Sequence, residues 1–376
     1  MQAYLRHWTA ALGQAKHLPM AELVVFVPGF FGFGSFGHPD RPLIEYFARV
    51  EDALLRAHLR PLRFVVHQPP PAASVADRVR SLHAKVTELI GAGATRLHLV
   101  GHSTGGVDVR LLAHPLYSGV PERAEMIRRV ASVITVSAPF YGTPLARRLG
   151  RTTWAAVPAL WFGSILASRG RLRIAGQAGA VWNLIKRAAA LRTTPTDEVI
   201  AQLADVDDDT AHQIRRFLAD VAGDHRLLDD LTPEAMGELN RSLAGTDPIA
   251  PISFVSVAPR AGLSPLTFIS APLQRVLYDV TWTLAASQPP PPAVVPEGPW
   301  IGQRKLVPQP TSNDGIVPAW SQTLSGRAEG IVLGDHLDVI GHYESAGATF
   351  LRSGSGFDDA RFRLLWDRVG RCILAA

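Results

Sequence analysis

Residues 98–106 read HLVGHSTGG and contain the pattern G-x-S-x-G, with Ser103 between two glycines. Glycine and serine are common turn residues, so the pattern alone does not separate a nucleophile from a turn. The flanking sequence favours the nucleophile. The branched aliphatic residues in 97–100 predict a buried strand, and the apolar run 107–112 predicts a helix. A serine at the sharp turn between them is where a nucleophile elbow lies.

The glycines on either side of Ser103 have a steric reason to be there. A serine in so tight a turn has strained backbone dihedral angles, and side chains at positions 101 and 105 would collide across the turn. The turn lifts the hydroxyl clear of the sheet, toward the N-terminus of the following helix. The free amides there favour developing negative charge, so the local sequence suits nucleophilic chemistry.

Outward from this turn, strands and helices alternate. Ser74 has the properties of a helix N-cap, with Asp77 three residues on and an apolar face behind it. The predicted elements around the turn are, in order, strand 23–27, strand 63–67, helix 74–93, strand 97–100, helix 107–112, strand 132–136 and, further on, strand 252–257. Short apolar strands alternating with helices predict an α/β fold with a mostly parallel central sheet flanked by helices.

The alternation stops between residues 145 and 245. The first half of this interval is apolar and contains Trp154, Trp161, Phe162 and Trp182. The second half is acidic, and Thr232 before Pro233 predicts a helix start. We therefore expect one domain over residues 1–376, with 145–245 inserted as a helical cap or lid. The proline-rich stretch 288–299 is expected to be extended polyproline and not a domain boundary.

Composition narrows the class of protein. The chain has 376 residues, of which 47% are hydrophobic and 19% charged, so a large core is expected and disorder is not. The formal charge is +5, but the arginines are scattered without interleaved aromatic residues, so no nucleic-acid partner is expected. The one cysteine, Cys372, excludes an intramolecular disulfide and a CxxC metal site.

The sequence also bears on location. The N-terminus lacks a basic region followed by an unbroken apolar segment, so we expect no secretory signal and a cytoplasmic protein. A secreted form that has lost its signal remains open. No run of about 18 apolar residues is present, so no transmembrane segment is expected. Peripheral contact with a lipid interface also stays open.

A serine hydroxyl becomes a good nucleophile when a histidine takes its proton and an acid orients that histidine. After a nucleophile elbow, the acid comes next in the chain and the histidine last. TSNDGIVP presents Asp314 in a turn-forming Asn-Asp-Gly, and LGDHLDVIGH presents His336 just after the apolar run GIVL. Both lie where a strand passes into a loop, in the required order. We predict a triad of Ser103, Asp314 and His336.

Other residues compete for these roles. His342 is six residues beyond His336, but the predicted strand ends before His336, which favours the earlier residue. Asp335 and Asp338 flank His336, yet a neighbouring residue does not fold back easily onto the imidazole ring. His102 is expected to pack behind the elbow.

The negative charge that develops on the substrate oxygen also needs donors. Two backbone amides are expected, one from Thr104, directly after the nucleophile, and one from the loop after an early strand. Phe30, just after Pro28-Gly29, is the natural second donor. The alternative is that Phe30 is an aromatic residue that only covers the core.

Several segments together resemble the true lipases of the α/β-hydrolase superfamily, in particular the bacterial triacylglycerol lipases of the Pseudomonas and Burkholderia type. The similar segments are VFVPGFFGFGSFG (25–37), 75–112 through the elbow, VSAPFYGTPLA (136–146), DLTPEAMGELN (230–240), SPLT (264–267), NDGIVP (313–318) and DHLDVIGH (335–342). The resemblance is patchy but extends over roughly residues 22 to 345. It implies an α/β-hydrolase fold with a lid.

The resemblance also implies a structural calcium held by two aspartates, one of them two residues after the catalytic histidine. Asp338 matches that position, and Asp279 is the acid in the region where the other belongs. Oxygen ligands suit such a hard cation. Asp338 as a helix N-cap or a salt-bridge partner is the alternative. The chain departs from these lipases at Pro28, where they usually have histidine, and in lacking their paired cysteines.

Together these features predict a carboxylic ester hydrolase, a lipase or esterase, that acts on apolar acyl esters and needs no cofactor for its chemistry. The aromatic-rich insertion would line an acyl pocket. An acyltransferase, a thioesterase or a polyester depolymerase could use the same triad, because the cap selects the acceptor and the serine does not. A non-catalytic lipid-binding hydrolase fold is a third alternative, but it predicts a broken triad.

Overall fold

The structure is a computed structural model. It describes residues 22–38, 40–57, 63–120, 123–148, 207–243, 247–260, 273–287, 295–302, 306–343 and 351–376. The predicted aromatic half of the insertion, the SPLT segment and the polyproline residues 288–294 lie outside these ranges.

Among the described residues the central sheet has seven strands, and every pairing between neighbours is parallel. In sheet order they are β4 (Arg63–Val66), β1 (Glu22–Val27), β5 (Arg96–His102), β6 (Val130–Val136), β7 (Ile252–Val257), β9 (Gly330–Leu333) and β8 (Trp300–Ile301). The central strands are continuous apolar runs because helices cover both faces. The side chains of Leu23 to Val27, for example, are all buried.

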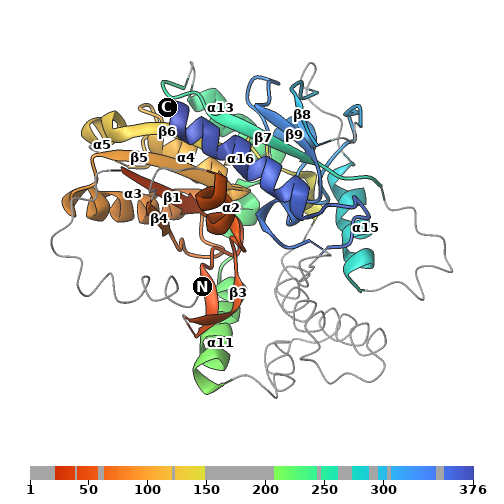
Figure 1. The fold of residues 1–376 in the computed structure, drawn as a ribbon, viewed down its shortest axis with the longest axis horizontal. Helices are drawn as coiled ribbons and strands as arrows, with labels where there is room; N and C mark the ends of the chain where they lie inside the picture. Colours follow the sequence, from red (N-terminus) through yellow and green to blue (C-terminus); the bar gives the residue numbers. More distant parts are fainter. Residues whose placement is uncertain are drawn as a thin grey trace.

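Helices flank this sheet (Figure 1). They include α2 (Val50–Ala57), α3 (Val75–Gly91), α4 (Thr104–Ala113), α5 (Ala124–Arg129) and α16 (Asp359–Ala375). In Figure 1, α16 crosses in front of the strands and α4 lies behind them. All ten residues of α4 are buried, and Trp366 of α16 packs edge-on against Phe26 of β1 with ring centroids 6.1 Å apart. The core thus lies on both sides of the sheet.

The predicted elements agree with the observed ones to within a few residues. Strand β7 has the predicted bounds, and the hydroxyl of Ser74 caps α3 by accepting from the amide of Asp77. Thr232 likewise caps α13 (Pro233–Ser242). A parallel sheet between two layers of helices, with Ser103 between β5 and α4, is the α/β-hydrolase fold, so the predicted fold class is confirmed.

The sequence did not predict a hairpin after β1. Strands β2 (Ser35–His38) and β3 (Arg41–Glu45) pair antiparallel within the glycine-rich segment, where alternation is too short to identify strands. Helix α11 (Asp208–Gly223) lies beside them and projects with them from the sheet (Figure 1). Phe217 of α11 contacts the ring of Phe36 at 5.2 Å between centroids. The hairpin and α11 therefore share a small aromatic core.

The described ends of the 145–245 insertion are tied to the body of the domain. They form α6 (Pro144–Arg148), α11, α12 (Arg226–Asp230) and α13. The carboxylate of Asp230 accepts from the amide of Val75 at 2.7 Å, at the start of α3. The side-chain amide of Asn240 donates to the carbonyl of Phe140 at 2.8 Å. That the insertion acts as a lid remains a prediction.

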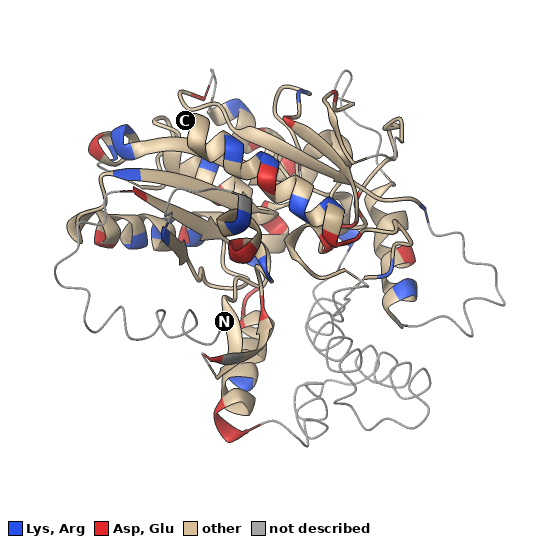
Figure 2. Ribbon diagram, in the orientation of Figure 1, with Lys and Arg blue, Asp and Glu red and all other residues tan. Residues whose placement is uncertain are grey.

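The remaining described elements are α15 (Leu273–Ala285) and the short 3-10 helices η2 (Ala319–Ser321) and η3 (Asp338–Ile340). Charges of both signs lie side by side along α16 (Figure 2), where Arg363 pairs with Asp359 and Arg371 with Asp367. None of the helices in the described ranges is long and apolar enough to cross a membrane.

Candidate active site

Ser103 lies in a strained turn between β5 and α4. Its φ is 55° and its ψ is −131°, a positive-φ conformation that costs a non-glycine residue free energy and is typical of functional sites. The amide of Ser103 donates to the carbonyl of Val136 at 2.9 Å, which ties the turn to strand β6. The residue is buried, with 5% of its surface exposed.

The surrounding glycines allow this turn to form. A Cβ on Gly101 would lie 2.2 Å from the carbonyl oxygen of Gly105, and one on Gly105 would lie 2.0 Å from that of Val27. A Cβ on Gly106 would lie 2.4 Å from the Cβ of Ala138. These contacts are with backbone or with a rigid methyl group, so no side-chain rotation relieves them. The steric reason given for the two flanking glycines therefore holds in the structure.

The chain that follows β1 passes directly beside Ser103. A Cβ on Gly29 would lie 2.4 Å from the Cβ of Ser103 and 2.9 Å from its hydroxyl oxygen. Phe30 is the next residue, and its half-buried ring packs on that of Phe31 at 4.3 Å between centroids. Thr104 is the first residue of α4. The two backbones expected to stabilise negative charge thus converge on Ser103.

A buried ion pair holds the segment that follows β1 in place. The guanidinium of Arg78, on α3, donates to the carboxylate of Asp108, on α4, at 2.7 Å, and to the carbonyl of Pro28 at 2.8 Å. Both side chains are fully buried. Burial raises the pKa of Asp108 to about 6, although the positive charge of Arg78 opposes the shift. Pro28, which stands where the resembling lipases have histidine, is therefore held through its carbonyl.

Asp314 is buried and accepts hydrogen bonds at both carboxylate oxygens. Its Oδ1 accepts from the amides of Ile316 at 3.0 Å and Val317 at 2.7 Å. Its Oδ2 accepts from the hydroxyl of Ser256 at 2.8 Å and from the side-chain amide of Gln322 at 3.2 Å. Donors on both oxygens fix the plane of the carboxylate.

His336 lies against that carboxylate. Its Nδ1 is 2.7 Å from Oδ2 of Asp314, and its backbone amide donates to the carbonyl of Asp314 at 2.9 Å. A carboxylate in this environment only accepts, so the proton of the imidazole lies on Nδ1. The two residues, 22 positions apart in sequence, therefore form a hydrogen-bonded pair at the ends of the strands.

The competing residues have other partners. Nε2 of His342 lies 3.0 Å from the carbonyl oxygen of Tyr46, so that ring is engaged away from Asp314. Asp335 accepts at Oδ1 from the amides of Leu337 and Asp338, at 3.1 and 3.0 Å. His102 does more than pack behind the elbow, because both of its ring nitrogens are hydrogen-bonded.

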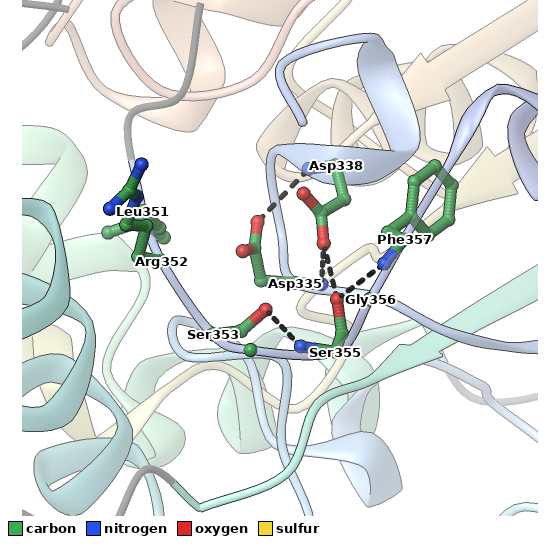
Figure 3. Close-up of a pocket in the computed structure, with 9 residues that line it drawn as sticks. Asp335, Asp338, Leu351, Arg352, Ser353, Ser355, Gly356 and Phe357 are labelled. Carbon is green, nitrogen blue, oxygen red and sulfur yellow. Dashed lines mark hydrogen bonds between the residues drawn. The ribbon is translucent and has the colours of Figure 1, made fainter. Parts of the chain in front are cut away.

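Asp335 and Asp338 build the turn that carries His336, beside a small pocket shown in Figure 3. Oδ2 of Asp338 accepts from the amide of Asp335 at 2.8 Å and from the hydroxyl of Ser355 at 3.0 Å. Oδ2 of Asp335 is buried, and no hydrogen-bond partner for it is found among the described residues. Burial raises the pKa of Asp335 to about 6 and that of Asp338 well above its usual range, and the second carboxylate adds to the latter shift.

This pair bears on the calcium expectation. Two buried carboxylates, one with an oxygen that has no partner in the described part of the chain, are a donor set that a hard cation fits. Asp279 lies on α15, half-buried, and no interaction between it and Asp338 is found in the described part of the chain. Nor do the described residues contain a cluster of three or more His, Cys, Asp or Glu side chains suited to a metal. Calcium at Asp279 and Asp338 stays a prediction, and Asp335 is the nearer partner for Asp338.

The residues that support the pair of Asp314 and His336 were not predicted from the sequence. Ser256 and Gln322 lie 58 and 8 positions from Asp314, and nothing in their local sequence marks them. For Arg78 and Asp108 the sequence held a weak signal of an ion pair, because a charged residue on the buried face of a predicted helix requires a partner.

Comparisons with known proteins give general likeness only. No family model matches the chain, and no curated protein does. Among solved structures, a metagenomic carboxyl esterase is 15% identical, over 96% of this chain and 77% of the other, with a TM-score of 0.49. EstA from Clostridium botulinum is 16% identical, over 94% and 90%, with a TM-score of 0.46. The Staphylococcus hyicus lipase is 17% identical, over 86% and 89%, with a TM-score of 0.44.

At such identities and TM-scores, the likeness supports no statement about activity or substrate. It also does not single out the Pseudomonas and Burkholderia lipases, so that narrower resemblance remains a prediction.

Proposed function

We propose that the protein is a serine carboxylic ester hydrolase, a lipase or esterase, with a triad of Ser103, Asp314 and His336. One observation carries the proposal: Nδ1 of His336 lies 2.7 Å from a buried, fully hydrogen-bonded carboxylate, at the end of the sheet where the strained Ser103 turn lies. A histidine oriented by an acid is the base that activates a serine.

In this mechanism the hydroxyl of Ser103 attacks the ester carbonyl, and Nε2 of His336 takes the hydroxyl proton. The negative charge on the substrate oxygen is stabilised by the amides of Phe30 and Thr104. His336 then gives its proton to the leaving alcohol, which leaves an acyl group on Ser103. A water molecule, activated by the same histidine, releases the acid and restores the serine. Asp314 keeps the imidazole in the required tautomer and stabilises its charged form.

The proposed substrate is an ester with an apolar acyl group, such as a lipid. Phe30 follows Gly29, which packs against Ser103, and it is half-buried. Its ring packs on that of Phe31, which belongs to a buried aromatic cluster with Phe33, Phe36 and Phe217. A partly exposed aromatic residue so close to the nucleophile favours hydrocarbon over polar groups. The chemistry needs no cofactor, since nucleophile, base and oxyanion donors are all protein groups.

Replacement of the nucleophile tests this function. Ser103→Ala should lower kcat on p-nitrophenyl acyl esters by at least about 10⁴-fold, because the covalent step is removed. Circular dichroism and thermal unfolding should be unchanged, since the substitution removes one oxygen. A fluorophosphonate probe should label the wild-type protein at Ser103, as mass spectrometry of the labelled peptide would show, and should not label the variant. Ester turnover retained by Ser103→Ala would overturn the assignment.

A further inference from the structure

Tyr46 lies between the three segments that make up the candidate site. Its backbone amide donates to the carbonyl of Gly34 at 2.8 Å, and its carbonyl accepts from Nε2 of His342 at 3.0 Å. Its hydroxyl lies 2.8 Å from the amide of Gly29 and 2.8 Å from Nδ1 of His102. Tyr46 is buried and thus belongs to the interior of the site, yet the mechanism above does not use it.

His102 continues the connection. Its Nε2 lies 2.9 Å from the carbonyl oxygen of His336, and the two rings pack with centroids 4.7 Å apart. His102 is also the residue immediately before Ser103. The side chain next to the nucleophile therefore contacts the backbone of the base.

The direction of every bond in this chain follows from chemistry. A carbonyl only accepts, so His102 carries a proton on Nε2 and donates it to His336. Burial and the neighbouring His336 hold the pKa of His102 well below its usual range, so the ring is neutral and Nδ1 accepts. Burial raises the pKa of Tyr46, so its hydroxyl stays protonated and donates to Nδ1. The oxygen of Tyr46 then accepts from the amide of Gly29.

We propose that Tyr46 and His102 are positioning residues that couple the oxyanion segment, the nucleophile elbow and the base loop through one chain of hydrogen bonds. Gly29 precedes Phe30, the proposed oxyanion donor, and His336 is the proposed base. The inference therefore rests on the proposed function. Neither Tyr46 nor His102 contacts the substrate in this proposal. Their effect is to hold the two amides and the imidazole at fixed distances from Ser103.

A positioning role differs from ordinary packing in its kinetic effect. A displaced oxyanion donor or base weakens interactions that exist only in the transition state, so kcat falls while KM changes little. A merely destabilising substitution lowers the amount of folded protein and leaves the kcat of the folded molecules unchanged. The number of active sites, titrated with a fluorophosphonate, separates the two cases.

The test compares substitutions in this chain of hydrogen bonds with matched substitutions elsewhere in the protein. Tyr46→Phe removes one hydroxyl, and His102→Leu removes both ring nitrogens. The controls are Tyr343→Phe, a buried tyrosine whose hydroxyl donates to Asp359 at 3.0 Å, and His98→Leu, a buried histidine of the same strand β5 that bonds to Ser132 at 2.8 Å. Each control loses comparable hydrogen bonds away from Ser103.

We expect Tyr46→Phe and His102→Leu each to lower kcat per titrated site by about 10-fold to 100-fold, with KM within about 3-fold. The controls should keep the wild-type kcat per site. The double variant should lose less than the product of the two single losses, because both substitutions break the same chain. His102→Gln, whose side-chain amide can still donate toward His336, should recover part of the loss seen in His102→Leu.

The outcomes separate this inference from the proposed function. If Tyr46→Phe and His102→Leu keep wild-type kcat per site, or lose no more than the controls, the positioning role is overturned. If Tyr46→Phe does not fold, the ratio between His102→Gln and His102→Leu decides. If the wild-type protein reacts with the fluorophosphonate but hydrolyses no ester, the proposed function fails, and the labelling rates of the same variants still test the coupling. If the wild type is not labelled at all, both are overturned.

Discussion

The two sides of the candidate site are held in place by different physical means. The nucleophile side is a turn of consecutive residues in which the backbone packs too closely for side chains. A Cβ atom on Gly105 or Gly101 would lie only 2.0 or 2.2 Å from a carbonyl oxygen. The base side joins segments far apart in sequence through side-chain hydrogen bonds to Asp314 and His336. The nucleophile side requires glycines without a Cβ atom, whereas the base side requires buried polar side chains. Substitutions on the two sides should therefore fail in different ways.

The base side should fail in its chemistry first. Asp314→Asn keeps an oxygen for the amides of Ile316 and Val317, so the loop keeps its turn. It places an amide or a neutral oxygen where His336 needs a carboxylate, which favours the wrong tautomer and removes the charge that stabilises the imidazolium. We expect kcat on an acyl ester to fall by about 10⁴-fold. Steady-state kinetics measures this loss.

The accompanying stability measurement sharpens the contrast. Urea unfolding of Asp314→Asn should show the wild-type slope and a small shift in midpoint, because the same backbone donors remain satisfied. A variant that unfolds in buffer would break the comparison, because the base side would then be as essential to the fold as the elbow.

Substitutions in the elbow should instead lower the stability of the fold. In Gly105→Ala the new methyl carbon would lie 2.0 Å from the carbonyl oxygen of Val27 and 2.8 Å from that of Pro28. Strand β1 would have to move away from α4, at a cost of about 1–3 kcal/mol or more. The same movement would displace Gly29 and Phe30 from Ser103, so activity per folded molecule should fall as well. Urea unfolding, with active-site titration, measures both.

Gly91→Ala is the matched control. Gly91 is the last residue of α3, and a Cβ there meets nothing within 4 Å. Alanine favours the helix over glycine by roughly 0.5–1 kcal/mol, so stability should stay the same or rise slightly. If Gly105→Ala were as well tolerated as Gly91→Ala, the elbow would not depend on close backbone approach.

The same contrast explains what the sequence could predict. Gly101, Ser103 and Gly105 lie within one turn, so their spacing in the sequence is enough to predict the tight turn. The structure confirms that this turn lies between strand β5 and helix α4. Asp314 and His336 were predicted as partners because the order of a triad along this fold is fixed, and the structure joins the two by a hydrogen bond. Ser256, Gln322 and Tyr46 were not found, since a hydrogen bond between distant segments leaves no periodic or spacing signal in either one. The hairpin β2–β3 was missed for a similar reason, because contacts with α11 support it.

The smallest expected effect concerns the acidic turn around His336. The pKa of Asp335 is about 6 in the folded protein, above its ordinary value of 3.8, so the folded state binds a proton more readily than the unfolded state between these pH values. Stability contributed by this group is present at low pH and is lost as pH rises from about 4 to about 6, by up to about 1.4 kcal/mol per pH unit. Asp335→Asn, which stays neutral, should therefore be more stable than the wild type above pH 6, by on the order of 1 kcal/mol.

Urea unfolding between pH 4 and pH 8, with EDTA or with millimolar calcium chloride, measures this difference. Asp367→Asn, which removes a half-buried carboxylate of α16 that pairs with Arg371, is the control for loss of a carboxylate outside this turn. If Asp335 and Asp338 hold a hard cation, calcium should raise the midpoint of the wild type and not that of Asp335→Asn, because a ligand that binds only the folded state stabilises it. A variant less stable than the wild type in EDTA at pH 8 would show that the Asp335 carboxylate stabilises the turn. In that case burial of the Asp335 charge would not destabilise the base side. The base side would then differ from the elbow only in that its interacting residues are far apart in the sequence.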